Sequence, residues 1–250
     1  PADAAGVAVE RDGAVLRVTL NRPAKLNALR PADIQALRAA MELPDGVRAV
    51  VFCGAGDRAF TAGMHVDSFD GLTPDSARTF IAGLREMLAA VRTAPVATVC
   101  VVDGYCLGVG FELALACDLR VATTRSSFGL PEIKVGIPSV ADAALLSQFV
   151  GLSLAKEMIL TGDLYPVDRF AASGLCNAVV EPERLTEATE EWVAKVAGHT
   201  PTATASQKRL FEVWQNTALA TGTAISVQEF ASVFAAEETA EQLRAYRNRL

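Results

Sequence analysis

The sequence predicts an α/β protein in which buried strands, glycine-containing loops and helices follow one another. Two stretches, Val47–Met64 and Val96–Glu112, each begin with a short apolar run and continue through a loop that contains glycine. Apolar runs of this length are typical of strands that are buried on both faces. Hydrophobic residues make up 51% of the 250 residues, which is enough for a sizeable core and too much for a disordered chain.

The second of these stretches carries the first candidate functional residue. Val96–Val102 is predicted to be a buried strand, and the glycine-rich run 104–110 lets the backbone turn tightly after it. Phe111–Cys117 is apolar on almost every side, which predicts a buried helix. One charge, Glu112, interrupts this helix in its first turn. Its carboxylate either interacts favourably with the helix dipole or acts as a catalytic acid or base with a tuned pKa.

The first part of the chain predicts a hairpin, a loop and a helix. Val7–Glu10 and Ala14–Leu20 have strand character, and the Arg11-Asp12-Gly13 run between them is a turn signal. The loop Asn21–Leu29 follows, and its basic residues belong either to a plain connector or to a site for an anionic ligand. Pro31–Met41 has apolar side chains at helical spacing.

Local signals define further elements in the middle of the chain. Thr73 is a predicted N-cap with proline at the first helical position, so Pro74–Val91 is predicted to be a helix. Leu119–Ala122 is predicted to be a short strand. Val140–Val150 is predicted to be a helix, and we interpret Asp142 near its start as an N-cap.

The last part of the chain is predicted to be largely helical. Short helices at 155–160 and 168–173 precede a last strand at Asn177–Val180, and helical patterning continues from Glu183 onward. Val227, Phe230 and Phe234 share one helical face. An aromatic stripe of this kind is typical of a docking surface, either within the chain or between subunits.

Composition and charge narrow the classes of protein. The net charge of −6 comes without a basic stripe, which argues against nucleic acid as the main partner. No apolar run reaches the ~18 residues of a membrane span, and residues 1–10 lack the pattern of a signal peptide. The five cysteines lie mostly in apolar runs, which predicts free thiols in a reducing, cytoplasmic setting. Neither histidine belongs to a cluster with metal-ligand spacing, so we expect no metal site.

Four segments, in matching order and spacing, resemble the crotonase family, the enoyl-CoA hydratase and isomerase superfamily. Asn21–Leu29 is similar to the family's early Asn-Arg-Pro loop, and Ala59–Met64 to its first oxyanion segment. Asp103–Asp118 is similar to its glycine-rich turn and helix, and Phe128–Pro138 to its second carboxylate segment. The match covers nearly the whole chain.

The resemblance implies a fold and a ligand. The fold is a spiral of ββα units over residues 1–190, with a C-terminal helical segment over 191–250 that forms trimers or hexamers. The ligand is an acyl-coenzyme A thioester, so coenzyme A is part of the substrate and no separate cofactor is expected. Two backbone N–H groups, by position those of Met64 and Val109, hold the thioester oxygen as it becomes an enolate. Unsatisfied N–H groups at a helix start are suited to this task.

The resemblance also assigns roles to side chains. Family hydratases use two glutamates, which fall on Glu112 and Glu132. We expect Glu112 chiefly to orient and deprotonate water and Glu132 to transfer the proton at C2, as a coupled pair. For Arg22 there are two interpretations: it helps to hold the phosphates of coenzyme A, or it pairs structurally with an acidic neighbour. The implied contacts are Arg22, Lys25, Ala28, Ala62 and Gly63 for coenzyme A, and His65, Gly108, Pro131 and Asp142 for the acyl group.

The sequence departs from the family pattern at three places. Val109 stands where most relatives have glycine, His65 stands where aspartate is frequent, and Ala141-Asp142 replaces a pair of glycines at the acyl end. An Asp142 that faced the pocket would disfavour a long plain fatty acyl chain, because an unpaired charge there is costly.

The leading hypothesis is an enoyl-CoA hydratase. One alternative is another crotonase-type enzyme such as a double-bond isomerase, which typically needs a single carboxylate. Another is a binding protein for acyl-CoA or RNA without turnover. The presence of both Glu112 and Glu132 favours hydration, and the acidic net charge disfavours RNA.

Overall fold

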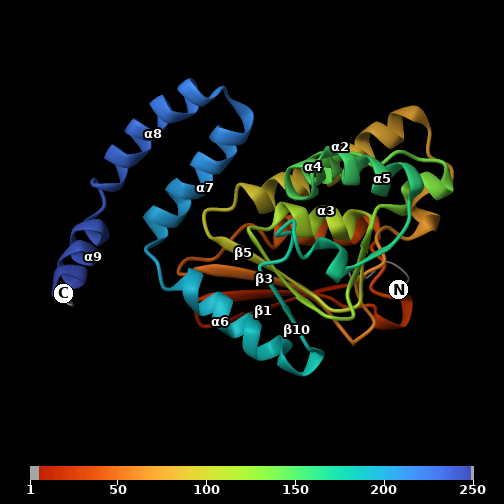
Figure 1. Ribbon diagram of the computed structural model, residues 1–250, viewed down its shortest axis with the longest axis horizontal. Helices are drawn as coiled ribbons and strands as arrows, with labels where there is room; N and C mark the ends of the chain where they lie inside the picture. Colours follow the sequence, from red (N-terminus) through yellow and green to blue (C-terminus); the bar gives the residue numbers. More distant parts are fainter. Residues whose placement is uncertain (1–5, 249–250) are drawn as a thin grey trace.

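The computed structural model describes residues 6–248, and two β-sheets form its framework (Figure 1). The larger sheet is mostly parallel, with one antiparallel pair at the β1 edge, and the smaller sheet is parallel except where its last two strands meet. In spatial order the strands of the larger sheet are β1 (Val7–Asp12), β2 (Val15–Leu20), β3 (Ala49–Gly54), β5 (Ala97–Val102), β7 (Leu119–Thr123) and β10 (Ala178–Val180). Those of the smaller sheet are β4 (Ala59–Thr61), β6 (Tyr105–Leu107), β8 (Ser127–Gly129) and β9 (Tyr165–Pro166).

From β3 to β8 the chain winds as a spiral in which each turn contributes one strand to the larger sheet, one strand to the smaller sheet and then helical structure. β3 and β4 precede helix α2 (Pro74–Arg92), and β5 and β6 precede helix α3 (Val109–Ala116). This arrangement confirms the predicted α/β fold of ββα units. The remaining helices are α1 (Pro31–Ala39), α4 (Leu146–Val150), α5 (Leu152–Thr161), α6 (Leu185–Ala197), α7 (Pro201–Asn216), α8 (Leu219–Val233) and α9 (Glu237–Arg247), with 3₁₀ helices η1 (Pro23–Lys25), η2 (Val66–Phe69), η3 (Pro131–Val135), η4 (Ala141–Leu145), η5 (Val167–Phe170) and η6 (Pro182–Arg184).

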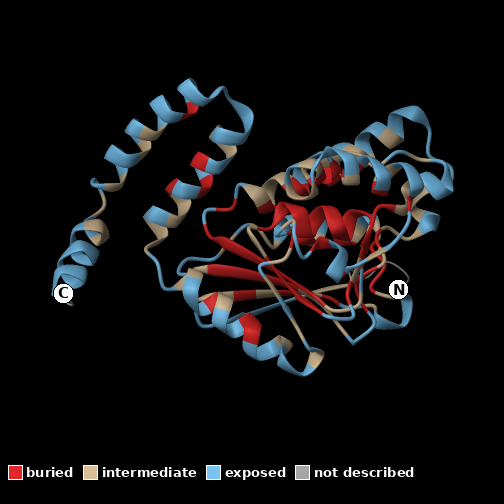
Figure 2. Cartoon of the chain, in the orientation of Figure 1, coloured by how far each residue is buried: buried red, intermediate tan, exposed pale blue. Residues whose placement is uncertain are grey.

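The larger sheet is covered on both faces, which explains why its central strands are continuously apolar. Val50 and Phe52 of β3 point to the face that packs against α1, α2 and α3. Ala49 and Val51 point to the opposite face, which is covered by α6. Successive side chains of a strand alternate between faces, so a strand buried on both sides needs apolar residues at every position. Figure 2 shows the fully buried α3 above these buried strands.

Helix α2 begins where the sequence predicted. Thr73 is its N-cap, and the Thr73 hydroxyl accepts a hydrogen bond from the Ser76 backbone N–H at 3.3 Å. Pro74 occupies the first helical position, where its missing N–H would have no intrahelical partner. This cap fixes the direction in which α2 crosses the molecule.

Two predicted elements differ from the observed ones. The loop expected within Val47–Met64 contains the strand β4, which pairs in the smaller sheet with strands such as β6 that had no predicted counterpart. Strands of three residues are too short to show alternation. The expected helix Val140–Val150 is the 3₁₀ helix η4 followed by α4, and its N-cap is Val140.

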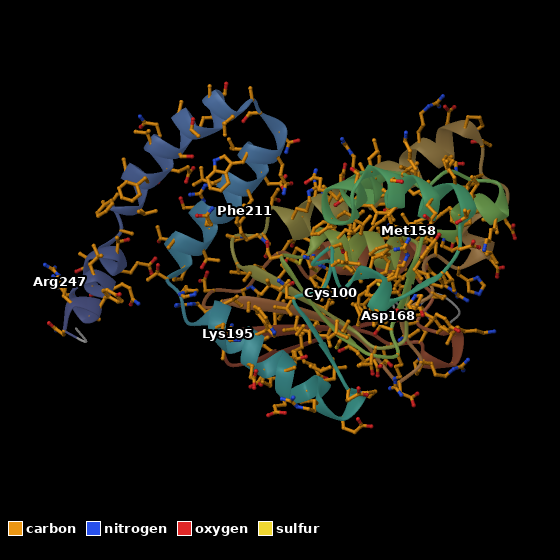
Figure 3. All side chains as sticks on the ribbon, viewed as in Figure 1. Cys100, Met158, Asp168, Lys195, Phe211 and Arg247 are labelled. Carbon is orange, nitrogen blue, oxygen red and sulfur yellow. The ribbon has the colours of Figure 1, made fainter. Side chains whose placement is uncertain are left out.

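The C-terminal helices α7, α8 and α9 extend away from the body of the molecule (Figures 1 and 3). Apolar side chains on α8 are strongly exposed, with Phe230 at 68% and Val227 at 64%. Helix α6 crosses the expected boundary between residues 190 and 191, and that division stays a prediction. No helix within residues 6–248 is long and apolar enough to cross a membrane. Residues 1–5, part of the stretch in which a signal peptide was sought, lie outside the described residues.

Candidate active site

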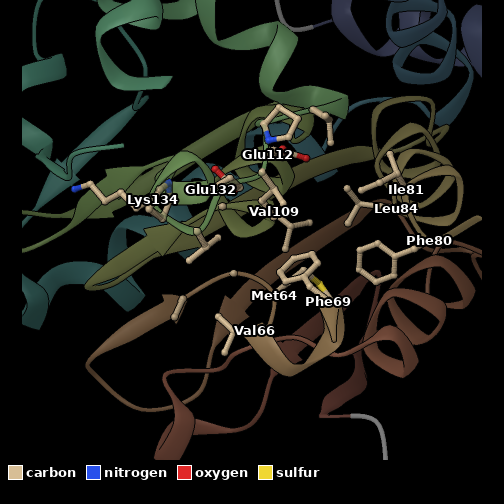
Figure 4. Close-up of a pocket in the computed structure, with 18 residues that line it drawn as sticks. Met64, Val66, Phe69, Phe80, Ile81, Leu84, Val109, Glu112, Glu132 and Lys134 are labelled. Atoms are coloured by element: carbon tan, nitrogen blue, oxygen red, sulfur yellow. The ribbon is translucent and has the colours of Figure 1, made fainter. Parts of the chain in front are cut away.

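Two carboxylates, one buried and one half-buried, face an apolar pocket between the smaller sheet and α2. The cavity has a volume of about 230 Å³, and Figure 4 shows Glu112 and Glu132 close to Val109 at its wall. The glutamates come from different turns of the spiral, Glu112 from the first turn of α3 and Glu132 from η3. The lining residues are Ala62, Gly63, Met64, Val66, Phe69, Phe80, Ile81, Leu84, Gly108, Val109, Glu112, Pro131, Glu132, Lys134, Val135, Ile137, Pro138 and Val140.

The smaller sheet brings two glycine loops into contact at the pocket. β4 and β6 are parallel neighbours, so Gly63 and Gly108, which follow them, lie at the same edge. Gly63 has a φ of 88° and Gly108 a φ of 55°, values that favour glycine. A Cβ on Gly63 would lie 2.9 Å from the Leu107 carbonyl oxygen. The close approach of the two loops therefore requires glycine at this point.

The residues after these glycines present two backbone N–H groups. Leu29 donates its N–H to the Gly63 carbonyl and accepts one from His65, which leaves the N–H of Met64 directed away from Leu29. Val109 is the first residue of α3, where a helix has no acceptor for its N–H. Among residues 6–248, neither the Met64 nor the Val109 amide donates to a protein acceptor.

Glu112 is held in an environment that disfavours its charged form. Glu112 is only 3% exposed, and its Oε2 has no hydrogen-bond partner within the described part of the chain. Burial raises the pKa of Glu112 well above its ordinary value, and the charges of Glu132 and Asp142 raise this pKa further. The backbone amide of Val140 hydrogen-bonds the carboxylate and lowers the pKa in part.

Glu132 is half-buried and is held by a neighbouring hydroxyl. Ser139 donates its Oγ–H to Oε2 of Glu132 at 2.8 Å. Burial raises the pKa of Glu132, while the hydrogen bond from Ser139 lowers it in part. A Cβ at Gly108 would lie 2.7 Å from Oε1 of Glu132, so glycine also makes room for this carboxylate. The two carboxylates lie close enough for the charge of Glu132 to act on Glu112.

The structure brings together eight of the predicted site residues. Ala62, Gly63, Met64, Gly108, Val109 and Pro131 line the same pocket as the two glutamates. Lys25 is exposed at the end of η1, and Ala28 is buried beside it; neither lines the pocket.

Two predicted contacts lie in a different cavity. Arg22 and His65 line an open polar cavity next to the start of α1. The guanidinium of Arg22 forms an ion pair with Asp33, which is fully buried, so the structure shows the pairing with an acidic neighbour. Nδ1 of His65 lies 3.3 Å from Oδ2 of Asp67, and His65 is not among the residues that line the pocket with the two glutamates. The structure therefore gives no support to the expected acyl contact of His65, which stays a prediction.

Asp142 neither caps a helix nor lines the acyl pocket, so both interpretations are corrected. Its side chain makes no capping hydrogen bond to η4. Both carboxylate oxygens lie 2.5 Å from Nη1 of Arg92, the last residue of α2. The sequence could not show this pair because its members are separated by 50 positions.

Sequence reasoning missed the residues that shape the apolar end of the pocket. Phe69 and Phe80 form an edge-to-face pair with ring centroids 5.8 Å apart, and Ile81 and Leu84 of α2 lie beside them (Figure 4). The helical spacing of Ile81 and Leu84 was a signal for a buried face. It did not say which surface that face covers. Ser139 was also missed, because a single serine carries no pattern.

No described residues form a group of three or more His, Cys, Asp or Glu side chains placed to hold a metal ion. Two carboxylates that differ in environment, next to two amides without acceptors, can move protons while an oxyanion is held.

Comparisons with known proteins agree with this geometry. A family model described as enoyl-CoA hydratase/isomerase matches residues 10–250. The chain is 29% identical to a short-chain-enoyl-CoA hydratase from Clostridium acetobutylicum, over 96% of this chain and 94% of that protein. The crystal structure of an enoyl-CoA hydratase from Bacillus anthracis has a TM-score of 0.91, with 28% identity, 98% of this chain and 96% of that chain covered. A Thermobifida fusca protein solved in complex with CoA has a TM-score of 0.85, with 28% identity and 95% of each chain covered.

Proposed function

The chain belongs to the enoyl-CoA hydratase/isomerase family, and from this premise we propose that Glu112 and Glu132 add water across the 2,3 double bond of a 2-enoyl-CoA thioester. The chain is an enoyl-CoA hydratase, a hydro-lyase, because relatives of that name match it over nearly their full length. The observation that carries the proposed roles is the pair of carboxylates, one buried and one half-buried, beside two backbone amides that lack acceptors within residues 6–248.

The amides of Met64 and Val109 form the proposed oxyanion hole. Both amides belong to pocket-lining residues, and the Val109 amide stands at the positive end of the α3 dipole. As water adds at C3, negative charge moves to the thioester oxygen, which becomes an enolate oxygen. Fixed donors that meet this charge stabilise the transition state more than the ground state.

The two carboxyl groups share one proton in the proposed mechanism. The ionised carboxylate accepts a proton from water as the water oxygen bonds to C3, and the protonated carboxyl gives its proton to C2. We assign the water chiefly to Glu112 and the C2 proton to Glu132. Without substrate the electrostatics favour the proton on Glu112, since burial and two carboxylates raise its pKa. The assignment therefore requires the proton to pass to Glu132 when substrate and water enter.

The pocket favours an apolar acyl group. Apart from the two glutamates, Lys134 is the charged side chain among the residues that line it, and Asp163 pairs with its Nζ at 2.8 Å. The other lining side chains are apolar. Burying a polar acyl substituent against them would cost free energy because it would find no hydrogen-bond partner. We propose plain or aryl 2-enoyl groups as substrates, with coenzyme A as part of the substrate.

The test of the proposed function is a panel of 2-enoyl-CoA thioesters in which loss of conjugation is followed by ultraviolet absorbance. The panel contains short, medium and phenyl-substituted acyl groups, and one acyl group that ends in a carboxylate. We expect hydration of the apolar members and at least tenfold lower kcat/KM for the charged one. Double-bond migration without hydrated product would instead support the isomerase alternative.

Lys25 is proposed to hold the phosphates of coenzyme A. It is exposed, and the next residue, Leu26, accepts a hydrogen bond at 2.9 Å from Ala62 of the pocket wall. We expect Lys25→Ala to raise KM about three- to tenfold with kcat nearly unchanged, because such a contact is equal in ground and transition states. Lys156→Ala, an exposed lysine on α5, is the matched control. An unchanged KM in Lys25→Ala would remove Lys25 from the site.

The assembly is proposed to be a trimer or a dimer of trimers formed through α7, α8 and α9. The exposed side chains of Val227, Phe230 and Phe234 support this, since a patch of this kind is costly in water. We expect light scattering at micromolar concentration to give three or six times the chain mass, and Phe230→Asp to lower it. Leu160→Asp, at a leucine 67% exposed on α5, should not change the mass. A monomeric wild-type chain would contradict the proposal.

We also propose a reducing compartment such as the cytoplasm. All five cysteines are free thiols, and Cys100, Cys106 and Cys117 are buried. Free buried thiols are usual where glutathione and thioredoxin keep cysteines reduced.

A further inference from the structure

The turn formed by residues 139–142 contacts both glutamates of the pocket. Ser139 donates its hydroxyl to Oε2 of Glu132 at 2.8 Å. The backbone amide of Val140, the next residue, hydrogen-bonds the carboxylate of Glu112. One short segment therefore sets the position of both carboxylates, and a shift of this turn would move the two groups together.

The backbone of this turn has a conformation that its own residues do not favour. Ala141 has a φ of 49°, in the left-handed region that residues other than glycine rarely adopt. Strained residues of this kind persist only where surrounding contacts fix them, and they are frequent at functional sites. A contact that holds the turn is therefore expected next to Ala141.

The contact next to Ala141 is a buried ion pair. Asp142 is 5% exposed, and both its carboxylate oxygens lie 2.5 Å from Nη1 of Arg92. Arg92 ends helix α2, whose Ile81 and Leu84 line the same pocket. The Nε of Arg92 also lies 3.4 Å from Oε1 of Glu212 on α7. The pair thus ties the turn to α2 on one side and to the first of the projecting helices on the other.

We propose that Asp142 and Arg92 are positioning residues. Their buried ion pair holds the 139–142 turn against α2, so that Ser139 and Val140 keep both glutamates in the positions that hydration needs. This inference rests on the proposed roles of Glu112 and Glu132. Neither Asp142 nor Arg92 lines the pocket, so the pair acts on the substrate only through the groups that it holds.

The pair also has an electrostatic consequence. The charged groups around Glu112 are Glu132 on η3, Asp142 on η4, and Arg92 at the end of α2 behind Asp142. The negative charge of Asp142 raises the pKa of Glu112, and Arg92 compensates that charge at contact distance. Removing Asp142 should therefore lower the pKa of Glu112, whereas removing Arg92 should raise it. Loss of a purely structural contact would not shift this pKa in opposite directions in the two variants.

The test compares Asp142→Asn with Arg92→Met by the pH dependence of kcat on the best 2-enoyl-CoA substrate. Both variants should lose about 10- to 100-fold in kcat with little change in KM, because the glutamates are displaced while substrate contacts remain. Asp142→Asn removes a negative charge near Glu112 and leaves Glu212 as the remaining partner of Arg92, so the acid limb should move to lower pH. Arg92→Met leaves Asp142 uncompensated, so the acid limb should move to higher pH. Arg92→Lys keeps the charge and should restore the wild-type limb.

The matched control is Asp118→Asn at the other end of α3. It breaks the ion pair in which Asp118 Oδ2 lies 2.6 Å from the buried Lys208 Nζ, and neither residue lines the pocket. It should lower the melting temperature but leave kcat and the acid limb unchanged. If Asp142→Asn folds poorly, the comparison of Arg92→Lys with Arg92→Met tests the same inference. The acid limb should then move in Arg92→Met and keep its wild-type position in Arg92→Lys.

Two results would overturn the inference. One is wild-type kcat in folded Asp142→Asn and Arg92→Met. The other is an acid limb that moves in the same direction in both variants. Failure of the proposed function would look different from failure of this inference. The wild-type enzyme would then show no hydration, or the Glu112→Gln variant would retain hydratase activity.

Discussion

Replacing either glutamate is expected to abolish most of the hydratase activity while the chain still folds. Glu112→Gln and Glu132→Gln should each lower kcat by about 10²–10⁴-fold, the usual contribution of a positioned acid or base. The amide keeps the shape of the side chain but cannot exchange a proton at neutral pH. The measurement is steady-state hydration with the best thioester of the panel. Near wild-type turnover in Glu132→Gln would contradict the two-carboxylate mechanism.

The stability of Glu112→Gln provides the control for folding. Burial and two neighbouring carboxylates raise the pKa of Glu112 in the folded chain. Above that raised pKa the ionised carboxylate destabilises the fold, and this cost disappears as the pH falls towards the ordinary value of 4.5. Glu112→Gln should therefore melt at a higher temperature than the wild type at alkaline pH, with a smaller difference at acid pH. A difference that grows as the pH falls would contradict the buried environment of Glu112.

Proton exchange at C2 separates the two roles. A saturated acyl-CoA has no double bond between C2 and C3 to hydrate, so exchange at C2 in D₂O reports only the proton transfer assigned to Glu132. Glu112→Gln should keep measurable exchange, whereas Glu132→Gln should lose it. The reverse result would exchange the two assignments within the pair without changing the need for both carboxyl groups.

Val109→Pro is expected to remove one donor of the oxyanion hole and lower kcat by about 10²–10³-fold, or about 2.7–4 kcal/mol. Folding should survive for two reasons. The Val109 amide donates to no acceptor within residues 6–248, so proline removes no protein hydrogen bond, and proline suits the first position of a helix. Gly108, with φ 55° and ψ −131°, has the mirror image of the extended conformation that precedes proline, which glycine can adopt.

The controls for this variant keep the donor and change only the side chain. Val109→Gly and Val109→Ala should retain activity, with a changed acyl preference because Val109 lines the pocket. Circular dichroism and thermal melting establish that all three variants fold. A folded and fully active Val109→Pro enzyme would refute the assignment of the amide. An inactive Val109→Gly enzyme of native stability would mean that the valine side chain itself positions the substrate.

The sequence by itself determined the elements that have local signals. The apolar runs at Val96–Val102 and Val47–Cys53 became β5 and β3, because a strand buried on both faces needs apolar residues throughout. Thr73 and Pro74 started α2 because a cap depends on neighbouring residues alone. Glu112 could be located for the same reason, because it is a single charge among apolar neighbours just after a glycine-rich turn. Glu132 had no such signal of its own and was identified only through the family resemblance.

Only the tertiary structure decided which distant groups meet. The strands β4, β6 and β8 are three residues long, and their parallel pairing, not their composition, sets Gly63 beside Gly108. The partner of Asp142 is Arg92, 50 positions away, and a local signal for capping predicted the wrong neighbour. Patterns in a sequence report the local backbone and the buried face, whereas ion pairs and pocket walls depend on how the spiral stacks its turns. The proposed roles of Glu112 and Glu132 rest on both, because the sequence supplies the carboxyl groups and the stacking supplies their shared pocket.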